Sequence, residues 1–393
     1  MEIIIVSNYY FPETGAAANR IKNMVQGLCD SNNFVNVICP MPNYPKGKVF
    51  AEFKGQIKHK EINENFSIYR FWIFPSISKN IVIRILSMFS FALSLWMFAF
   101  NYKKIKNTEW VIIQNSPLLV SFSSIILFKY LFKRKIALNV SDLWPLSALE
   151  LGVIKKGKFY SSLEWIEKFN YKSSDFIIGQ SNEILEHVNH LVNRPQFLYR
   201  NIQVENSESR DPSFRGNTFN IVYAGLLGVA QGVLDIVKNV DFKKLGVQFH
   251  IYGSGYELDK LLQYIKDNPA TNVVYKGSLS KHELNQVIGN YDASIVPLCT
   301  NIKGAVPSKI YELIHYQIPI LYVGGGEAAD LIQKWKIGFT SFPHDFVALE
   351  KNIVILKNLS LFDYNLILNN CKFVSDEELN FKKQIKELKN KLK

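Results

Sequence analysis

Cysteine is scarce in this sequence, and its distribution excludes a small scaffold held together by disulfide bonds. The chain contains four scattered cysteines and no C-x-x-C pair; they are Cys29, Cys39, Cys299 and Cys371. This pattern is typical of a reducing compartment. The start, MEIIIVSNYYFP, also lacks the positive region and the small-residue cleavage site of a secretory signal. We therefore expect a cytoplasmic protein.

Glycine and proline are few as well, at 21 and 14 of 393 residues, while hydrophobic residues make up 48%. This balance excludes collagen-like and intrinsically disordered chains. Because one domain averages about 150 residues, the length predicts two folded domains.

The motifs of several site classes are missing. The sequence has no Asp-x-Asp pair to hold a metal ion and no G-x-G-x-x-G, G-x-S-x-G or Walker loop. His187 and His190 are the only close pair of histidines. No cysteine or carboxylate completes a ligand pattern with them, so we expect them on a helix surface. We therefore expect neither a metal nor a cofactor.

Acidic residues are underrepresented in the first half of the chain. Residues 1–200 carry 24 lysines and arginines against 14 acidic residues, whereas the remainder carries 22 against 20. A one-sided positive surface favours an anionic partner, either a membrane leaflet or a nucleic acid. Because the aromatic residues lie in apolar runs and not between basic clusters, we expect no nucleic acid. The alternative is that the excess reflects only a lysine-rich proteome.

Short apolar runs alternate with helix-length segments along the chain. Strand candidates are residues 2–7, 34–39, 110–114, 135–140, 176–179, 220–223, 248–252, 273–275, 293–297 and 318–323, and a helix is expected at 19–29. Strands that are buried on both faces must be apolar throughout, so the pattern predicts parallel sheets wrapped by helices.

A polar stretch at 204–217 interrupts this alternation and indicates an interdomain connection. The prediction is an α/β protein whose parts are an N-terminal domain at 1–200, a linker at 201–217, a second α/β domain at 218–375 and a C-terminal helix at 376–393. Open α/β sheets bind ligands at the carboxyl ends of their strands. A cleft between the two halves is the expected site.

Residues 81–100 form the longest apolar run, in which Arg84 is the only charge, and the cluster Lys103, Lys104 and Lys106 follows. Twenty residues are enough to span a bilayer. Three interpretations are open: a helix or helical hairpin docked on the inner leaflet, a buried core helix, and a true span. Docking through 81–106 is favoured because a span here would separate the strands of one α/β domain.

Three loops carry candidate site residues. Small side chains after Gly15 would let the backbone approach an anion at a helix start, although a tight turn explains them too. At the start of a later helix, Ser308 and Lys309 could hold a diphosphate, and Glu312 could accept hydrogen bonds from a sugar. Lys309 and Glu312 could also be an ordinary surface pair. Asp142 ends a strand and is either a base, a substrate ligand or a helix cap.

These stretches together resemble the GT-B glycosyltransferases of family 4, and within it the bacterial surface-polysaccharide enzymes that transfer N-acetyl-fucosamine or similar aminosugars. The resemblance is carried along the whole chain, by SNYYFPETGAAANRI at 7–21, VSDLWPLSALELGV at 140–153, YAGLLGVAQG at 223–232, VPSKIYE at 306–312 and GGGEAADLI at 324–332. It implies two Rossmann-like domains that face each other across a cleft. The nucleotide-sugar would bind the C-terminal domain and the acceptor the N-terminal one.

The resemblance also implies residue roles. Asp142 and Lys309 would be catalytic, and Glu312 would hold the donor ribose as the second glutamate of a Glu-x7-Glu motif. The other donor-binding residues would be Gly15, Gln231, Gly277, Leu279, Pro307 and Ser308, and residues on the acceptor side would be Glu13, Asn19 and Arg20.

Three positions depart from the family pattern. Gly304 stands where the first glutamate of Glu-x7-Glu is expected, Gln231 stands near the position of a phosphate-binding lysine, and Ser141 replaces the histidine before Asp142. These departures concern the catalytic assignment more than the fold.

The function implied by the resemblance is a metal-independent, retaining transfer. An aminosugar would move from a nucleotide-sugar, expected to be UDP-linked, to a polyprenyl-diphosphate-linked glycan in O-antigen or capsule synthesis, on the inner face of the cell membrane. Two alternatives stay open. One is an enzyme similar to the nucleotide-sugar 2-epimerases, and the other is a non-catalytic protein of polysaccharide assembly.

Overall fold

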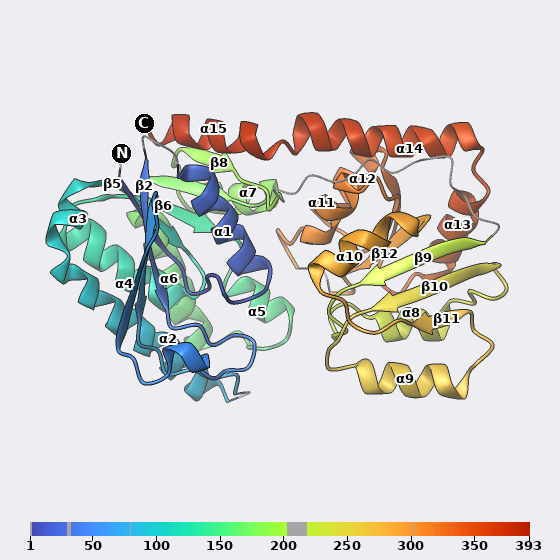
Figure 1. Cartoon of the computed structure of the whole chain (residues 1–393), viewed down its shortest axis with the longest axis horizontal. Coiled ribbons are helices and arrows are strands. Elements are labelled where there is room, and N and C mark those ends of the chain that lie inside the picture. Colours follow the sequence, from blue (N-terminus) through green and yellow to red (C-terminus); the bar gives the residue numbers. More distant parts are fainter. Residues whose placement is uncertain (1, 30–32, 79, 203–217, 301) are drawn as a thin grey trace. The chain divides into compact units, whose positions relative to one another are not determined.

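The computed structural model describes residues 2–29, 33–78, 80–202, 218–300 and 302–393 (Figure 1). The chain divides into two compact units. Unit 1 consists of Met1–Asn201 together with Phe381–Lys393, and unit 2 consists of Ile202–Asn380. All but two residues of the expected linker at 201–217 lie outside the described residues.

Unit 1 is built on an eight-stranded sheet with the order β3-β4-β2-β1-β5-β6-β7-β8. The strands are β1 (Glu2–Val6), β2 (Phe34–Pro40), β3 (Lys58–Ile62), β4 (Phe66–Phe71), β5 (Thr108–Gln114), β6 (Lys135–Val140), β7 (Phe176–Gly179) and β8 (Gln196–Leu198). Every neighbouring pair is parallel except β3 with β4. The sequence did not predict β3, β4 or β8. The first has only polar residues before its last position, the second includes a buried arginine, and the third is three residues long.

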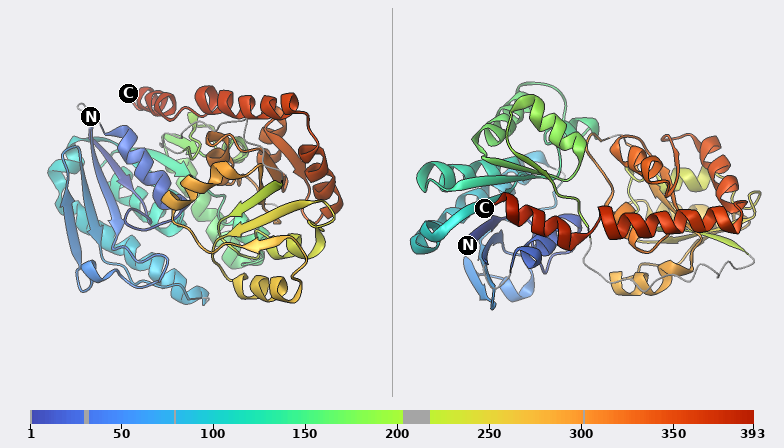
Figure 2. Two further views of the ribbon diagram at one scale, coloured as in Figure 1. Left: turned by 45° about the vertical axis from the view of Figure 1, so that its right-hand side comes forward. Right: turned by 90° about the horizontal axis from the view of Figure 1, so that it is seen from above.

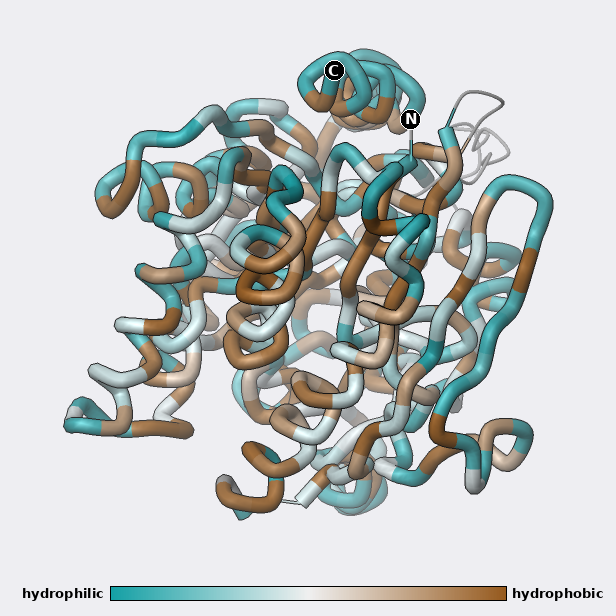
Figure 3. The backbone as a smooth tube through the Cα atoms, turned by 90° about the vertical axis from the view of Figure 1, so that its left-hand side faces the viewer, coloured by the Kyte–Doolittle hydropathy of each residue, from teal (hydrophilic) through white to brown (hydrophobic). Residues whose placement is uncertain are grey.

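Helices cover both faces of this sheet. They are α1 (Ala16–Leu28), α2 (Ile81–Ser94), α3 (Tyr102–Asn107), α4 (Leu118–Ile125), α5 (Leu146–Glu150), α6 (Lys158–Ser173), α7 (Asn182–Leu191) and α15 (Phe381–Lys391), with short turns η1 (Ala51–Phe53), η2 (Leu95–Phe100) and η3 (Ile126–Leu131). Side chains alternate across a strand, so Ile4 of β1 packs in a core with α2, α4, α6 and α7, while Ile3 packs in a second core with α1 and α15. Figure 3 shows hydrophobic segments, in brown, in the strands and helices of this unit.

The C-terminal helix belongs to unit 1. A π-helical turn, η5 (Val374–Glu378), follows α14 (Leu361–Phe373), and α15 then packs against α1 (Figures 1 and 2). Leu388 is fully buried there, and the side-chain amide of Gln384 exchanges hydrogen bonds of 2.9 and 3.0 Å with the backbone of Arg200. The sequence prediction of one helix from residue 376 is therefore wrong at its start, because residues 374–378 continue the preceding helix as a π turn.

Unit 2 contains a six-stranded, wholly parallel sheet with the order β11-β10-β9-β12-β13-β14. Its elements besides α14 and η5 are β9 (Phe219–Ala224), α8 (Val233–Asn239), β10 (Val247–Tyr252), α9 (Leu258–Asp267), β11 (Val273–Tyr275), α10 (Lys281–Val287), η4 (Ile288–Asn290), β12 (Ala293–Pro297), α11 (Ser308–His315), β13 (Ile320–Val323), α12 (Glu327–Trp335), β14 (Gly338–Ser341) and α13 (Phe346–Lys357). Because all strands run the same way, their carboxyl ends share one edge. The α/β prediction is confirmed for both units.

Residues 81–100 form α2 and then the 3-10 helix η2. One side of this segment is core, since Phe91, Leu95 and Phe98 are fully buried. The other side exposes apolar residues at every third or fourth position, and these define the α2 stripe: Val82, Leu86, Phe89, Leu93, Trp96 and Phe100, with exposed fractions from 37% to 91%. By length and composition residues 82–100 could cross a membrane, and only 22% of this apolar window is buried. A wholly buried core helix is therefore the wrong interpretation.

Candidate active site

The loops at the carboxyl edge of the unit 2 sheet are joined by backbone hydrogen bonds. The N–H of Gly225 donates to Tyr252 and the N–H of Gly253 donates to Gly277, each over 2.9 Å. These bonds join the loops that follow β9, β10 and β11, which we call the glycine loops. A Cβ atom on Gly253, whose φ is +144°, would lie 1.8 Å from the carbonyl oxygen of Gly225, so this close approach requires glycine.

Lys309 reaches this edge from the first turn of α11. Its Nζ donates a hydrogen bond of 3.2 Å to the Tyr223 hydroxyl and lies 4.3 Å from the centroid of that ring. Burial lowers the pKa of Lys309 to about 8, although the nearby Glu312 charge works in the opposite direction. The geometry therefore holds one desolvated amine at the end of a central strand, where an anion would stabilise its charged form.

The start of α11 lies at the same edge because the loop after β12 leads into it. Pro307 precedes the first turn and provides no side-chain acceptor, so the first backbone N–H groups are not capped by that side chain. Ser308 is half-buried in this first turn, and Glu312 follows one turn later. The structure thus brings Pro307, Ser308, Lys309 and Glu312 together on one short helix of eight residues.

The other predicted donor residues lie on neighbouring loops of this edge. Gln231 is half-buried in the loop after β9, and its carbonyl accepts a weak hydrogen bond from Cys299. Gly277 follows β11 with a φ of +93°. Leu279 comes just before Ser280, which caps α10 in a reciprocal capping box with Glu283. The Gly277 carbonyl accepts from the N–H of Gly253 after β10, and the N–H of Gln231 donates to the carbonyl of Gly228 within the loop after β9.

Gly304 occupies the position where the resemblance expects a carboxylate. It is buried, and its φ of +78° is a conformation that side-chain-bearing residues rarely adopt. A residue with a side chain, glutamate included, would adopt this backbone conformation only with strain.

In unit 1 the predicted residues surround the carboxyl ends of β1, β2 and β6. Gly15, with a φ of +132°, stands at the start of α1, which begins three residues earlier than the sequence predicted. The buried Glu13 carboxylate accepts hydrogen bonds from the N–H groups of Asn43 (2.8 Å) and Tyr44 (2.9 Å). Desolvation raises the pKa of Glu13 and these donors lower it. Glu13 therefore holds the loops after β1 and β2 together.

Arg20 is buried, with 2% of its surface exposed, whereas its neighbour Asn19 is exposed. The Arg20 guanidinium donates to the side-chain oxygens of Asn139 (2.7 Å) and Gln180 (2.9 Å) and so connects the ends of β6 and β7. The Asp142 side chain is exposed just beyond β6. The surrounding protein removes part of the water around the carboxyl group and raises the pKa of Asp142, although the nearby Arg20 charge works in the opposite direction. Arg20 thus holds together the strand ends next to Asp142.

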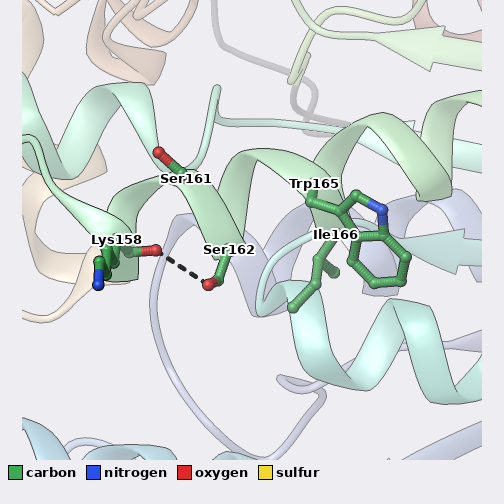
Figure 4. A pocket seen from close by; sticks show the side chains of 5 residues that line it. All are labelled: Lys158, Ser161, Ser162, Trp165 and Ile166. Atoms are coloured by element: carbon green, nitrogen blue, oxygen red, sulfur yellow. Dashed lines mark hydrogen bonds between the residues drawn. The ribbon is translucent and has the colours of Figure 1, made fainter.

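A surface cavity of about 620 Å³ lies elsewhere in unit 1, on α6 (Figure 4). It is lined by five residues of α6: Lys158, Ser161, Ser162, Trp165 and Ile166. Four of them are exposed, and the Ser162 hydroxyl donates to the carbonyl of Lys158 within the helix. This is an open hollow on one helix face and holds none of the predicted site residues.

Among the described residues, no group of three or more His, Cys, Asp or Glu side chains is arranged to hold a metal ion. His187 lies on α7 with its Nε2 3.6 Å from the Glu167 carboxylate of α6. The residues that sequence reasoning missed are Tyr223, Gly225 and Gly253. Tyr223 and Gly225 stand in a stretch that carried the resemblance, but the contacts of all three join residues far apart in sequence and left no local signal.

Comparisons with known proteins place the fold. No protein-family model matches the chain, and no curated protein sequence matches it significantly. Among solved structures, sucrose-phosphate synthase from Thermosynechococcus elongatus has a TM-score of 0.73 at 11% identity, over 99% of this chain and 97% of that one. An α,α-trehalose-phosphate synthase (UDP-forming) from Burkholderia xenovorans has a TM-score of 0.70 at 12% identity, over 99% of both chains.

A third similar structure is the lipopolysaccharide outer core galactosyltransferase WaaB, with a TM-score of 0.60 at 15% identity over 98% of both chains. The similarity covers nearly the full length of each chain. The protein therefore has the GT-B fold, with two units that each contain a mostly parallel sheet covered by helices.

Proposed function

We propose that this protein is a glycosyltransferase that moves a sugar from a nucleotide-sugar donor to an acceptor. The observation that carries the proposal is the Lys309 amine, held over the Tyr223 ring beside the glycine loops at the carboxyl edge of a parallel sheet. This edge is where open α/β sheets bind ligands, and a desolvated cation is suited to a diphosphate. The GT-B fold shared with a UDP-forming α,α-trehalose-phosphate synthase adds support.

The reaction retains the anomeric configuration and needs no metal. The bond between the anomeric carbon and the diphosphate oxygen breaks while the acceptor oxygen attacks from the same face, and the acceptor proton passes to the departing diphosphate. Lys309 and the N–H groups at the start of α11 stabilise the negative charge that grows on this leaving group. Asp142 orients the acceptor or the sugar, and the backbone at Gly15 approaches the donor phosphates.

The donor is a UDP-linked aminosugar, such as UDP-N-acetyl-fucosamine. Glu312 holds the ribose, and the turn containing Gly277 and Leu279 holds the base. Gly304 leaves the sugar without the usual carboxylate, so the acetamido group of an aminosugar takes its hydrogen bonds elsewhere on this edge.

The acceptor is a polyprenyl-diphosphate-linked glycan of O-antigen or capsule synthesis, and the protein works at the inner face of the cell membrane. The α2 stripe supports this part of the proposal, because six exposed apolar side chains along one segment form a larger patch than scattered surface residues do. Arg84 lies on the same helix, and three lysines follow on α3. Apolar contact and attraction to anionic lipid thus act together.

The helix lies in the plane of the leaflet and does not cross it. Its inner side, at Phe91, Leu95 and Phe98, is part of the core beneath the unit 1 sheet, and the side-chain hydroxyl of Ser123 on α4 donates to the carbonyl of Ala92. Pulling α2 into a bilayer would expose this core, so docking is favoured over a span.

The test uses membranes that contain the protein and a polyprenyl-diphosphate-linked acceptor. They are incubated with UDP-, GDP- and dTDP-sugars, and the lipid-linked glycan is analysed by mass. We expect one UDP-aminosugar to lengthen the glycan by one residue, and membranes with the Lys309→Ala variant to give little product. Free epimerised nucleotide-sugar without acceptor would instead indicate an epimerase. Donor binding without transfer to any acceptor would indicate a non-catalytic assembly protein.

A further inference from the structure

Tyr223 closes one side of the space that holds the Lys309 amine. Its side chain is fully buried at the end of β9. The hydroxyl accepts the 3.2 Å hydrogen bond from Lys309 and donates its own proton to the carbonyl of Leu226 in the following loop. Both hydrogen-bonding roles of the hydroxyl are therefore used, and its orientation is fixed toward the amine.

Gly225 also lies against the Lys309 amine. A Cβ atom built on this glycine would lie 1.9 Å from the Nζ of Lys309 and 2.4 Å from its Cε. The amine thus lies directly against the Gly225 backbone, in a notch that a larger residue would fill. The φ of +152° at Gly225 is also one that other residues rarely adopt.

These contacts fix a side chain that is flexible by nature. A lysine has four rotatable bonds and loses conformational freedom whenever its amine is held in one place. Here the aromatic face, the hydroxyl and the glycine notch hold the amine before any ligand arrives. Such preorganisation is what makes a charged group effective toward an anion.

We propose that Tyr223 is a positioning residue, which holds the Lys309 amine at the carboxyl end of β9 so that it faces the donor diphosphate, and that Gly225 is required to leave room for the amine. The inference rests on the proposed function. It adds a role for two residues that do not themselves touch the substrate.

The test is a double-mutant cycle on the binding of UDP, measured by calorimetry with the full-length protein. We expect Lys309→Ala to weaken UDP binding by about 10- to 100-fold, as for loss of one charge-assisted hydrogen bond. Tyr223→Leu should weaken it by about 3- to 30-fold. In the double variant, binding should be no weaker than in Lys309→Ala, because Tyr223 acts only through the lysine.

Two further variants sharpen this result. Gly225→Ala should weaken UDP binding when Lys309 is present, because the alanine Cβ displaces the Lys309 amine. In the Lys309→Ala background the same substitution should have little further effect. Tyr322→Phe is the matched control: Tyr322 is also fully buried on a strand of this sheet and donates to the carbonyl of Gly325, but it lies on β13. We expect UDP binding in Tyr322→Phe to equal that of the wild type.

Tyr223→Phe keeps the ring and serves if the leucine variant does not fold. Lys309 is faced by Tyr223 from β9 and by Glu312 from its own helix. Loss of the hydroxyl removes an acceptor for the charged amine, so UDP binding should decline at a lower pH than in the wild type. A merely structural tyrosine would lower the unfolding temperature and leave this midpoint unchanged.

The outcomes separate the two proposals. If the wild type binds UDP but the effects of Tyr223→Leu and Lys309→Ala multiply, the positioning role is refuted and the proposed function stands. An unchanged pH midpoint in Tyr223→Phe refutes it equally. If the wild type binds no nucleoside diphosphate at all, both proposals fall.

Discussion

The two units of this protein differ in the sign of their net charge. Unit 1 has 30 lysines and arginines against 15 acidic residues, a net charge of +15, whereas unit 2 has 16 against 19, a net charge of −3. Yet Lys309, whose amine the proposed function assigns to the donor diphosphate, belongs to the negative unit. Net charge attracts a protein to an extended anionic surface, but a compact anion requires one desolvated cation in a fixed position.

Exposed apolar residues also differ between the two units. In unit 1 the α2 stripe repeats at every third or fourth position along one segment, whereas unit 2 divides its exposed apolar residues among helices, including α13 and α14, and several loops. Those on α14 are Leu361, Phe362, Leu366 and Phe373. Scattered apolar residues are normal on a protein surface, but a contiguous stripe marks an interaction site. The proposed function accordingly assigns surface recognition to unit 1 and donor recognition to unit 2.

The largest effect is expected from the α2 stripe. Replacing Leu86, Phe89 and Leu93 together by glutamate removes three side chains that each contribute about 1.5–3 kcal/mol when buried. The added charges also repel anionic lipid. Sedimentation with vesicles of anionic phospholipid should show loss of binding.

The matched control for this experiment is Val347→Glu, because Val347 is 78% exposed on α13 of unit 2. We expect it to bind vesicles as the wild type does. Equal binding by the triple variant would remove α2 from the membrane-docking role and leave basic charge as the remaining attraction.

The second prediction concerns the packing of the C-terminal helix α15 in unit 1. Leu388→Ala opens a cavity between α15 and α1 and should lower the free energy of unfolding of unit 1 by about 2–5 kcal/mol. Hydrogen exchange resolved by peptide would measure both units at once. We expect faster exchange in the unit 1 strands and unchanged exchange in β9–β13. Faster exchange confined to unit 2 would contradict the division of the chain given above.

The third prediction concerns catalysis. Lys309→Ala should raise the barrier to sugar transfer by about 2–4 kcal/mol, as does loss of a donor that stabilises a developing anion. Initial rates with saturating donor and acceptor provide the measurement. Lys303→Ala is the control, since Lys303 is exposed in the loop before α11. If both variants turn over like the wild type, unit 2 does not hold the leaving group through Lys309.

The smallest effect is a pH dependence. The free protein has a Lys309 pKa of about 8, below the usual value for lysine because the amine is buried. UDP binds the protonated amine better, so affinity should be constant below pH 8 and fall above it. The fall is at most tenfold, or about 1.4 kcal/mol, per pH unit. The Lys309→Ala variant should show no such decline between pH 8 and 9.5, and a parallel decline in that variant would assign the titration to another group.

Much of the fold could be predicted from local pattern. Runs such as Ile3–Val6 and Ile295–Val296 are apolar because both faces of a parallel sheet are covered, and this leaves a clear signal. The edge strands β3, β8 and β14 left none, and neither did β4, which lies next to β3. Arg70 of β4 is buried because its guanidinium is paired with Glu61 and with the carbonyl oxygen of Phe11, 59 positions earlier. Pairing of this kind depends on how the strands and loops are packed and cannot be recognised from local pattern.

The candidate site was predictable to a lesser degree. The residue types around Lys309 suggested an anion site, but an ordinary surface pair with Glu312 explained them too. In the structure Lys309 reaches Tyr223, 86 positions earlier, so it is not an ordinary surface residue, and its role toward an anion stays a prediction. In unit 1, Glu13 and Arg20 were expected near the acceptor, and the structure shows both engaged in holding loops and strand ends.

The sequence alone determined the alternating strands and helices, the basic first half and the apolar segment at 81–100, because burial and helical or strand periodicity act on neighbouring residues. Only the tertiary structure decided that one side of α2 is core and the other is exposed, and that the last helix returns to unit 1. It alone placed the Lys309 amine on a tyrosine ring. Each of these depends on packing between segments far apart in the chain, and such packing has no local period.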